Sequence, residues 1–536
     1  MAKQAIIHVE NTEGVIEFAQ FLSDAGWTIL SANRTEEILK KAKIPVEREP
    51  ALVENNLYLN DTSSLIKRVI STSFYSEQEG PGVQEPEIGI LCVNVQPAIH
   101  VITSEKKFKS ITKPFNFFVS TLLRNAFLNY ENILILSDPN DYKEAMIQIR
   151  TNSISQDFRI KLAAKALNLV SAFDGGIASS ILMTSKDEND FMKYLTYPFE
   201  KQFMLYGGAN QHQSSCLYRF PGGGGIVSSI QKQKGKELSY NSVSDISFAW
   251  EQISMLATNL KNQFSVKSVN CDGYKFETQF TPLTGTVFTL AVYNKSILGA
   301  SLSTNVLDSF KKTYTYDKEN IRRVTFASSV VIDESVAEEI VKCHFTSVVS
   351  PGFTAGAKEI LSKDKSVNLV QTAKINTADY EMELINGGLL FQTKDKVLFD
   401  IWNVKTKNRP GQIFADQMAF GTILTMGSHS YSAVLLKNNS VVGISQAAKS
   451  PQRSIDRAIE EAILHKSQNP DSDEILADVL VCDAPVYLND SIRKLAEHGL
   501  KAILQPGGTD RDEELIQFCN EQLISMIFTG MTHISH

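Results

Sequence analysis

The first forty-five residues alternate short apolar runs with segments of helical periodicity. Residues 5–9 form an apolar run short enough for a buried strand, and apolar side chains then recur at helical spacing over residues 15–22. Gly26 stands where helices commonly end, and a second apolar run follows at residues 27–30. Parallel strands joined by helices need cover on both faces of their sheet. The pattern therefore predicts a βαβα start to a doubly wound α/β domain.

The same alternation of strand and helix patterns returns further along the chain. An apolar run at residues 133–136 precedes a long helical stretch at 159–182, and the last sixty residues alternate again. The polar segment 185–190 separates the two halves and is typical of a domain boundary. We therefore expect one domain over residues 1–190 and a second region over residues 191–536.

Composition narrows the class of protein. The chain has 536 residues, of which 43% are hydrophobic, and a formal net charge of −7. Because phosphate backbones are bound by concentrated basic surfaces, the acidic balance argues against a nucleic-acid partner. No segment approaches the roughly 18 consecutive apolar residues of a membrane span. Met1 is followed almost at once by an apolar strand pattern, which indicates no signal peptide. We expect a cytoplasmic protein with no membrane contact.

The six cysteines of the chain lie far apart in sequence. None belongs to a CxxC pair or to a Cys/His cluster with the spacing of zinc ligands. Reduced, buried thiols of a cytosolic protein are the simpler interpretation. We therefore expect no metal site.

Several segments, taken in order, resemble one known family. The C-terminal segments are similar to the signature and to the ending of the transformylase domain in the bifunctional AICAR transformylase/IMP cyclohydrolase family of purine biosynthesis. The matching segments are collinear along the chain, at residues 138–139, 162–166, 210–213, 235–241, 387–390, 504–514 and 528–536. The chain is identified by this resemblance as a divergent member of that family.

The resemblance implies a fold and two reactions. It implies an N-terminal domain of methylglyoxal-synthase-like fold, which closes the purine ring to give IMP. It also implies a C-terminal region of two cytidine-deaminase-like lobes, which transfers a formyl group from 10-formyltetrahydrofolate to the amine of AICAR. The implied ligands are a purine nucleotide monophosphate and a folate. The implied assembly is a homodimer with the transformylase sites at its interface.

The N-terminal site of the family is much altered in this chain. The first phosphate loop of the family reads Glu-Asn-Thr-Glu-Gly at residues 10–14, so two carboxylates stand where a phosphate would bind. The second phosphate loop, at residues 31–35, has lost both glycines, and Arg34 is a candidate compensating contact. Of a third family motif only Lys67 persists, and a family aspartate is Asn116. We expect this domain to be a scaffold without ring-closing activity.

The C-terminal site keeps part of its expected chemistry. Formyl transfer needs a base with a pKa near neutral and donors for the developing oxyanion. The Lys-His loop of the family reads Lys267-Ser268 here, and Asn270 also survives from that loop. A serine hydroxyl cannot act unaided as a base near pH 7. His212 keeps a motif position and is the remaining candidate base, although a structural role for it stays open.

Substrate contacts are partly lost as well. Asn210 and Asn241 match polar positions of the family, whereas Ser432 stands where the family has asparagine. Arg453 lies close to the place of a lost family arginine, and the arginine near the C-terminus is Thr532. A short hydroxyl cannot replace the bidentate fork of an arginine. We expect Asn210, Asn241, Ser432 and Arg453 to be substrate contacts if the site is active.

Three functions follow from these substitutions. The first is a family enzyme in which formyl transfer, through Lys267 and His212, is more plausible than ring closure. The second is a non-catalytic homologue that acts as a structural or regulatory partner. The third is an enzyme for another substrate, with Arg34 and Arg453 as relocated anion contacts.

Overall fold

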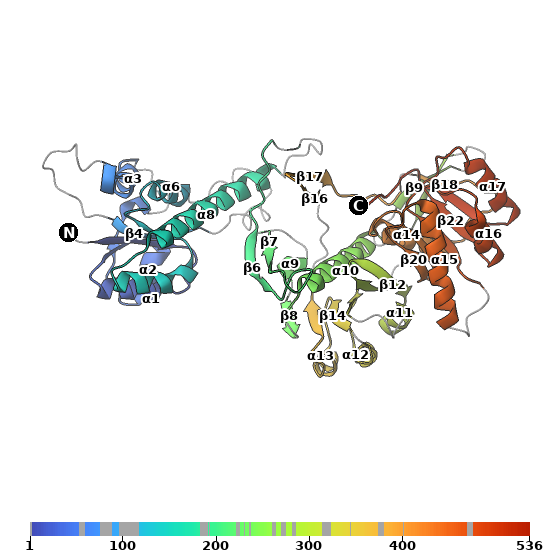
Figure 1. The fold of residues 1–536 in the computed structure, drawn as a ribbon, viewed down its shortest axis with the longest axis horizontal. Helices are drawn as coiled ribbons and strands as arrows, with labels where there is room; N and C mark the ends of the chain where they lie inside the picture. Colours follow the sequence, from blue (N-terminus) through green and yellow to red (C-terminus); the bar gives the residue numbers. More distant parts are fainter. Residues whose placement is uncertain are drawn as a thin grey trace. The chain divides into compact units, whose positions relative to one another are not determined.

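A computed structural model gives the fold of the chain. It describes residues 3–52, 59–74, 88–95, 117–182, 191, 193–220, 226–229, 231–234, 237–259, 264–269, 275–280, 286–313, 323–343, 345–372, 380–399, 401–468 and 475–535. The chain forms two compact units (Figure 1). Unit 1 comprises Met1–Lys201 and Tyr218–Gly223, and unit 2 comprises Gln202–Leu217 and Gly224–His536.

Unit 1 is built on a parallel five-stranded sheet of order β3-β2-β1-β4-β5. Its strands are β1 (Gln4–Val9), β2 (Thr28–Ser31), β3 (Glu47–Arg48), β4 (Ile88–Asn94) and β5 (Leu134–Leu136). Its helices are α1 (Val15–Asp24), α2 (Asn33–Lys41), α3 (Leu59–Phe74), α6 (Phe117–Phe127), α7 (Tyr142–Arg150) and α8 (Gln156–Leu182), with short 3-10 turns at Pro50–Leu52 and Pro139–Asp141.

Helices cover both faces of this sheet, as the βαβα pattern predicts. Helix α1 buries Val15, Phe18, Ala19 and Leu22, one stripe at helical spacing, in an apolar cluster that also contains residues of α2 and α7. The opposite face is covered by α3, by α6 and by most of the buried apolar side chains of α8. Figure 1 shows α3, α6 and α8 on one side of β4, and α1 and α2 on the other. A doubly wound arrangement is therefore confirmed for this unit.

Unit 2 contains two lobes with the same order of elements. The first lobe consists of α10 (Tyr240–Asn259), β11 (Val287–Tyr293), β12 (Ser296–Ser303), α11 (Val306–Thr313), β13 (Val324–Ser328), α12 (Glu334–Ile340), β14 (Phe345–Ser350), α13 (Ala355–Leu361) and β15 (Asn368–Gln371). The second lobe consists of α14 (Gln412–Met426), β19 (Ala433–Lys437), β20 (Ser440–Ser445), α15 (Pro451–Gln468), β21 (Val479–Cys482), α16 (Asp490–Glu497), β22 (Ala502–Gln505), α17 (Asp512–Glu521) and β23 (Ser525–Phe528).

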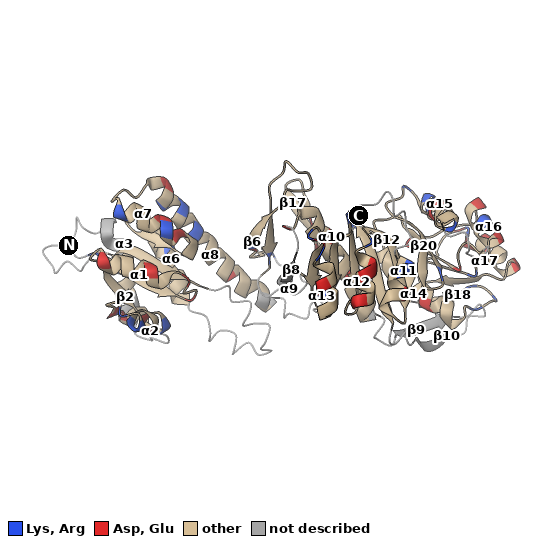
Figure 2. Ribbon diagram, turned by 90° about the horizontal axis from the view of Figure 1, so that it is seen from below, with Lys and Arg blue, Asp and Glu red and all other residues tan. Residues whose placement is uncertain are grey.

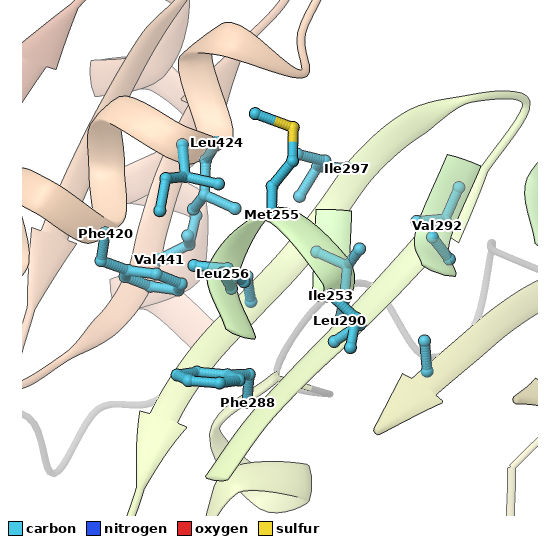
Figure 3. Close-up of a cluster of buried hydrophobic side chains, with 14 of the residues drawn as sticks. Ile253, Met255, Leu256, Phe288, Leu290, Val292, Ile297, Phe420, Leu424 and Val441 are labelled. Atoms are coloured by element: carbon cyan, nitrogen blue, oxygen red, sulfur yellow. The ribbon is translucent and has the colours of Figure 1, made fainter. Parts of the chain in front are cut away.

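Strand pairing repeats between the lobes. In each lobe a hairpin is antiparallel, its first strand pairs antiparallel with the third strand, and the third, fourth and fifth strands are parallel. The lobes join where β12 pairs antiparallel with β20, at Ser301 and Ser440. They thus share one 14-stranded sheet. Behind the joint, α10 and α14 bury Leu256, Phe420 and Leu424 in one cluster (Figure 3).

Shorter elements extend unit 2. Strand β8 (Gln231–Lys234) pairs with β15, and β18 (Ile401–Val404) pairs with β23 and carries β9 (Phe264–Val269) and β10 (Lys275–Phe280) at the sheet edge. Two hairpins form separate two-stranded sheets, β6 (Glu200–Leu205) with β7 (Ser215–Arg219), and β16 (Tyr380–Ile385) with β17 (Gly388–Thr393). Helix α9 spans Ile226–Ser229. Across the described ranges, no helix combines the length and apolarity needed to cross a bilayer.

Gly443 permits the closest approach of a helix to the sheet of the second lobe. A Cβ on Gly443 would lie 2.1 Å from the carbonyl oxygen of Ala458 and 3.0 Å from the amide nitrogen of Ala462, both on α15. We predict that Gly443→Ala lowers the free energy of unfolding by about 1–3 kcal/mol, because α15 must move away from β20. Urea unfolding followed by circular dichroism measures the loss.

Gly411, which precedes α14, provides the control. A Cβ on Gly411 would meet nothing within 4 Å, and its φ of −67° suits any residue. Gly411→Ala should therefore cost less than about 1 kcal/mol. Equal losses in the two variants would show that the contact with α15 is not the cause.

Candidate functional site

The sheet of unit 1 places its ligand crevice between β1 and β4. In open parallel sheets, ligands bind beyond the carboxyl ends of the strands, where neighbouring connections leave in opposite directions. The strand order of unit 1 puts this point at the loop of residues 10–14, which follows β1, and at Asn94, which ends β4. This is the loop that the sequence likens to a phosphate loop.

The Asn94 side chain closes this loop from within the chain. Its Oδ1 accepts hydrogen bonds from the backbone N–H groups of Glu10 (2.8 Å) and Asn11 (3.0 Å), and its Nδ2 donates to the Asn11 carbonyl (3.3 Å). The backbone N–H of Glu13 donates to Asn11 Oδ1 at 3.0 Å. Anion sites depend on backbone N–H groups that point at the ligand. Three such groups of this loop already have partners.

Arg34 and Lys67 make no side-chain hydrogen bond or ion pair with the other described residues. Arg34 lies in the first turn of α2 and Lys67 in α3, and both are exposed. The neighbouring Arg68 has the structural role instead, since it pairs with Glu49 at 3.2 Å and hydrogen-bonds the Gln4 side chain. Sequence reasoning missed Asn94, because its partners lie 83 and 84 residues away in the chain.

Unit 2 contains a buried polar cluster beside the end of β21. Asp483 is 1% exposed. Its Oδ2 accepts hydrogen bonds from the Ser430 hydroxyl (2.6 Å), the Ser432 backbone N–H (2.9 Å) and the Ser432 hydroxyl (3.0 Å). Burial raises the pKa of the Asp483 carboxyl above its usual value, and these hydrogen bonds oppose that rise. Its Oδ1 is buried without a hydrogen-bond partner among the described residues.

The C-terminal segment completes this cluster through His533. The His533 Nδ1 lies 2.7 Å from Asp395 Oδ2, and its Nε2 lies 3.0 Å from the Leu398 carbonyl oxygen. Each ring nitrogen of His533 thus faces an oxygen that accepts hydrogen bonds. The backbone N–H of Ser535 donates to Ser430 Oγ at 3.1 Å. Sequence reasoning did not name His533 as a site residue, although its family motif contains that histidine.

The predicted residues of the C-terminal half lie in different places. Ser432 is fully buried against Asp483. The Arg453 side chain, in the first turn of α15, is 71% exposed and lies 3.7 Å from Asp456. On β9, the backbone of Lys267 pairs with Ile401 and that of Ser268 with Trp402, so both belong to the edge next to β18. Asn270 lies outside the described residues.

The turn between β6 and β7 holds Asn210 and His212, and Asn241 at the start of α10 contacts it. The Asn210 backbone N–H donates to Gln213 Oε1 at 2.9 Å, and the Asn241 side chain donates to the Ala209 carbonyl at 3.2 Å. Asn210, His212 and Asn241 are all exposed. Figure 1 shows β6 and β7 near α9, and Figure 2 shows β6 near α9. In the sheet order, β9 and β18 lie close to the end opposite to β8. The turn that carries His212 thus contacts α10 of the first lobe, whereas β9, which carries Lys267, is joined through β18 to β23 of the second lobe.

No metal centre is formed by the part of the chain that the structure describes, since no three His, Cys, Asp or Glu side chains there are grouped to hold an ion. The site region of unit 2 thus offers hydroxyl, amide, imidazole and carboxyl groups. These are groups for hydrogen bonding and proton transfer.

Comparison with known proteins agrees with the fold. A family model described as AICARFT/IMPCHase bienzyme matches residues 126–461. The bifunctional purine biosynthesis protein PurH of Clostridium acetobutylicum is 28% identical over 544 residues, and the similarity covers 100% of both chains. The protein of the same name from Petrotoga mobilis is 26% identical over 545 residues, again with 100% of both chains covered.

A solved structure described as the crystal structure of ForH gives a weaker match. It is 22% identical, covers 34% of this chain and 100% of its own, and has a TM-score of 0.29. The fold and the polar clusters define an α/β protein of two units, the first with a parallel sheet and the second with a mixed sheet. The chain belongs to the AICARFT/IMPCHase bienzyme family.

Asp483 supports a test of the buried cluster. Asp483→Ala removes the acceptor of the Ser432 N–H and the shorter of the two contacts that each serine hydroxyl makes as a donor. We therefore predict a loss of about 1–3 kcal/mol in the free energy of unfolding. Asp483→Asn keeps an acceptor oxygen and removes the buried charge, so it should stay within about 1 kcal/mol of wild type at pH 7. Urea unfolding of the three proteins measures both values.

The dependence of folding stability on pH provides the control for the Asp483 variants. Because the folded pKa of Asp483 is raised, ionisation costs stability above that pKa, and the cost is relieved as pH falls through it. The stability of wild type relative to Asp483→Asn should therefore rise on acidification. A difference that stays constant, or equal losses in the Asn and Ala variants, would contradict this account of Asp483.

Proposed function

We propose that the protein transfers the formyl group of 10-formyltetrahydrofolate to the amine of AICAR, and that it does not close the purine ring. The full-length similarity to bifunctional PurH proteins supports formyl transfer. The closed loop after β1 is the observation that separates the two reactions, because Asn94 occupies N–H groups that a nucleotide phosphate needs. The ligands are then a purine nucleotide monophosphate and a folate, and the compartment is the cytoplasm.

The finer fold assignment is part of this proposal. Residues 1–190 form a methylglyoxal-synthase-like domain, and residues 191–536 form a region of two cytidine-deaminase-like lobes. The repeated order of helices and strands in unit 2 supports two lobes of common descent. The doubly wound sheet of unit 1 is compatible with the first assignment. Fold alone does not carry the activity, which depends on the site residues.

We further propose that the active protein is a homodimer with shared sites. The separation of the β6–β7 turn from β9 within one chain supports this, since His212 of one protomer then meets Lys267 of its partner. The hairpin of β16 and β17 also supports it, because Leu384 is 86% exposed and Leu390 is 55% exposed. A two-stranded sheet needs apolar cover to be stable, and a second copy supplies it.

The chemistry assigns different roles to the predicted residues. His212 is exposed on its turn and acts as the base that takes a proton from the AICAR amine. Lys267 supplies positive charge to the oxyanion on the formyl carbon. Ser432 acts indirectly, because its polar contacts go to Asp483 and to the Thr425 carbonyl. The remaining proposed contacts are Asn210, Asn241, Ser268, Asn270 and Arg453 in unit 2, and Arg34 and Lys67 in unit 1.

The two family reactions can be separated by their products. With AICAR and 10-formyltetrahydrofolate, the purified protein should accumulate formyl-AICAR and no IMP, which chromatography with absorbance detection resolves. Formyl-AICAR supplied directly should remain unchanged. IMP formation would contradict the closed N-terminal site, and absence of both products would favour the non-catalytic alternative.

A shared site predicts complementation between two inactive variants. His212→Ala and Lys267→Ala should each abolish formyl transfer as homodimers. Co-expression of the two should restore about one quarter of wild-type activity, because half of the dimers are mixed and each mixed dimer has one intact site. Initial rates of formyl-AICAR formation measure the recovery.

The double variant in one chain is the matched control. Co-expressed with wild type, the protein carrying both His212→Ala and Lys267→Ala should leave about one quarter of the activity if sites are shared, and about one half if they are not. No recovery in the first mixture together with one half in the second would place each site within a single chain.

A further inference from the structure

Three buried polar side chains lie in a row across the first lobe. Thr325 on β13 pairs in register with Ser347 on β14, which pairs with Asn368 on β15. They are 1%, 0% and 4% exposed, respectively. Thr325 Oγ1, Ser347 Oγ and Asn368 Oδ1 have no hydrogen-bond partner among the described residues. Residues paired in register project from the same face of a sheet, so the three groups form one polar row.

The polar row faces helix α10. Two residues further along each strand, Ala327, Val349 and Val370 lie in the apolar cluster that contains Ile246 and Trp250 of α10. The intervening residues of the three strands belong to the cluster on the opposite face. Because side chains alternate between faces with a period of two, the polar row shares the α10 face.

The second lobe provides an internal comparison. The Ser350 carbonyl accepts a hydrogen bond from the N–H that follows β15, and the Gln505 carbonyl accepts the corresponding bond from the N–H that follows β23. Ser350 and Gln505 are therefore equivalent positions in the two lobes. Ser347 and Ala502, each three residues earlier, are equivalent as well. Val479 and Ser525 both pair with Ala502, just as Thr325 and Asn368 both pair with Ser347. Val479 therefore corresponds to Thr325, and Ser525 corresponds to Asn368.

The comparison shows that the fold does not require polar groups at two of the three places, since only Ser525 of the second lobe is polar. Val479 and Ala502 are buried in the apolar cluster beneath α14. The first lobe has hydroxyl groups at both places. Each buried polar group without a partner costs about 1–3 kcal/mol. Three such groups would cost an amount comparable with the ~5–15 kcal/mol stability of a whole domain. The row therefore needs hydrogen-bonding partners.

Geometry and charge define the partner. Neighbouring strands lie about 4.8 Å apart, and Thr325 Oγ1 and Ser347 Oγ make no direct hydrogen bond with each other in the described part of the chain. A water molecule that makes two bonds of about 2.8 Å spans that separation. The row carries no charged side chain, so it offers nothing specific to an ion. Hydroxyl groups donate and accept, as does water.

We propose that the first lobe holds internal water molecules that bridge Thr325, Ser347 and Asn368 beneath α10. The second lobe is dry at the matching place. Helix α10 also carries Asn241, which donates to Ala209 in the turn of His212. The hydrated face thus lies under the helix that supports this turn. The proposal rests on the fold alone and is independent of the proposed function.

High-resolution crystallography of the full chain tests the proposal directly. We expect separate peaks of water density within hydrogen-bonding distance of Thr325 Oγ1 and Ser347 Oγ. Continuous density of an organic molecule would replace water with another guest and overturn the assignment. Direct bonds from both hydroxyls to backbone carbonyls, with no density between them, would overturn it too.

Thermal unfolding of matched variants tests the energetic coupling. Thr325→Val and Ser347→Ala should each lower Tm by about 2–4 °C, because the bridging water loses a partner. The double variant should lose less than the sum, because an apolar pair no longer requires water. In the dry lobe, Ala502→Ser should lower Tm, since its hydroxyl has no bridging partner. Additive losses, or a gain in Tm from either single variant, would overturn the proposal.

Discussion

The pairing of β12 with β20 is the contact on which the arrangement of unit 2 depends. An unpaired sheet edge exposes N–H and C=O groups that must be satisfied elsewhere. Here the two lobes satisfy each other, at Ser301 and Ser440 and through a 2.8 Å hydrogen bond from the Leu302 N–H to the Asn439 carbonyl. The joint makes one sheet of two lobes, and it brings α10 and α14 into a shared core (Figure 3). The outer edges of that sheet remain available for β8, β18, β9 and β10.

Hydrogen-bond satisfaction distinguishes the two units. In unit 1 the Asn94 carboxamide accepts hydrogen bonds from two backbone N–H groups of the loop after β1, so these donors are satisfied within the chain. In unit 2 three donors gather on one oxygen of Asp483, and its other oxygen is buried without a partner in the described part of the chain. The Asn94 loop of unit 1 therefore fits a structural scaffold. The Asp483 cluster of unit 2 fits a region whose polar groups hold other segments in place. The C-terminal segment is one of these, because His533 contacts both Asp395 and Leu398.

Two features of unit 2 lead to a second copy of the chain. The β6–β7 turn contacts the first lobe through Asn241, whereas β9 is joined to the second lobe through β18, and the proposed site draws on both. The leucines of the β16–β17 hairpin are exposed in a sheet of only two strands. A dimer interface accounts for both features at once, since it covers apolar surface and joins the two half-sites. The internal waters proposed beneath α10 would then lie behind one half-site.

The sequence by itself determined the local elements and the family. Apolar runs and helical stripes depend on nearby residues, so the βαβα start and the alternation near the C-terminus could be read directly. The collinear motifs gave the family, which the comparisons confirm. Only the tertiary structure decided which distant groups meet. The partners of Asn94 and His533 lie 84 and 138 residues away, and no local period encodes such contacts. The lobe repeat was hidden for the same reason, because sheet pairing preserves a fold while its side chains change, as at Thr325 and Val479.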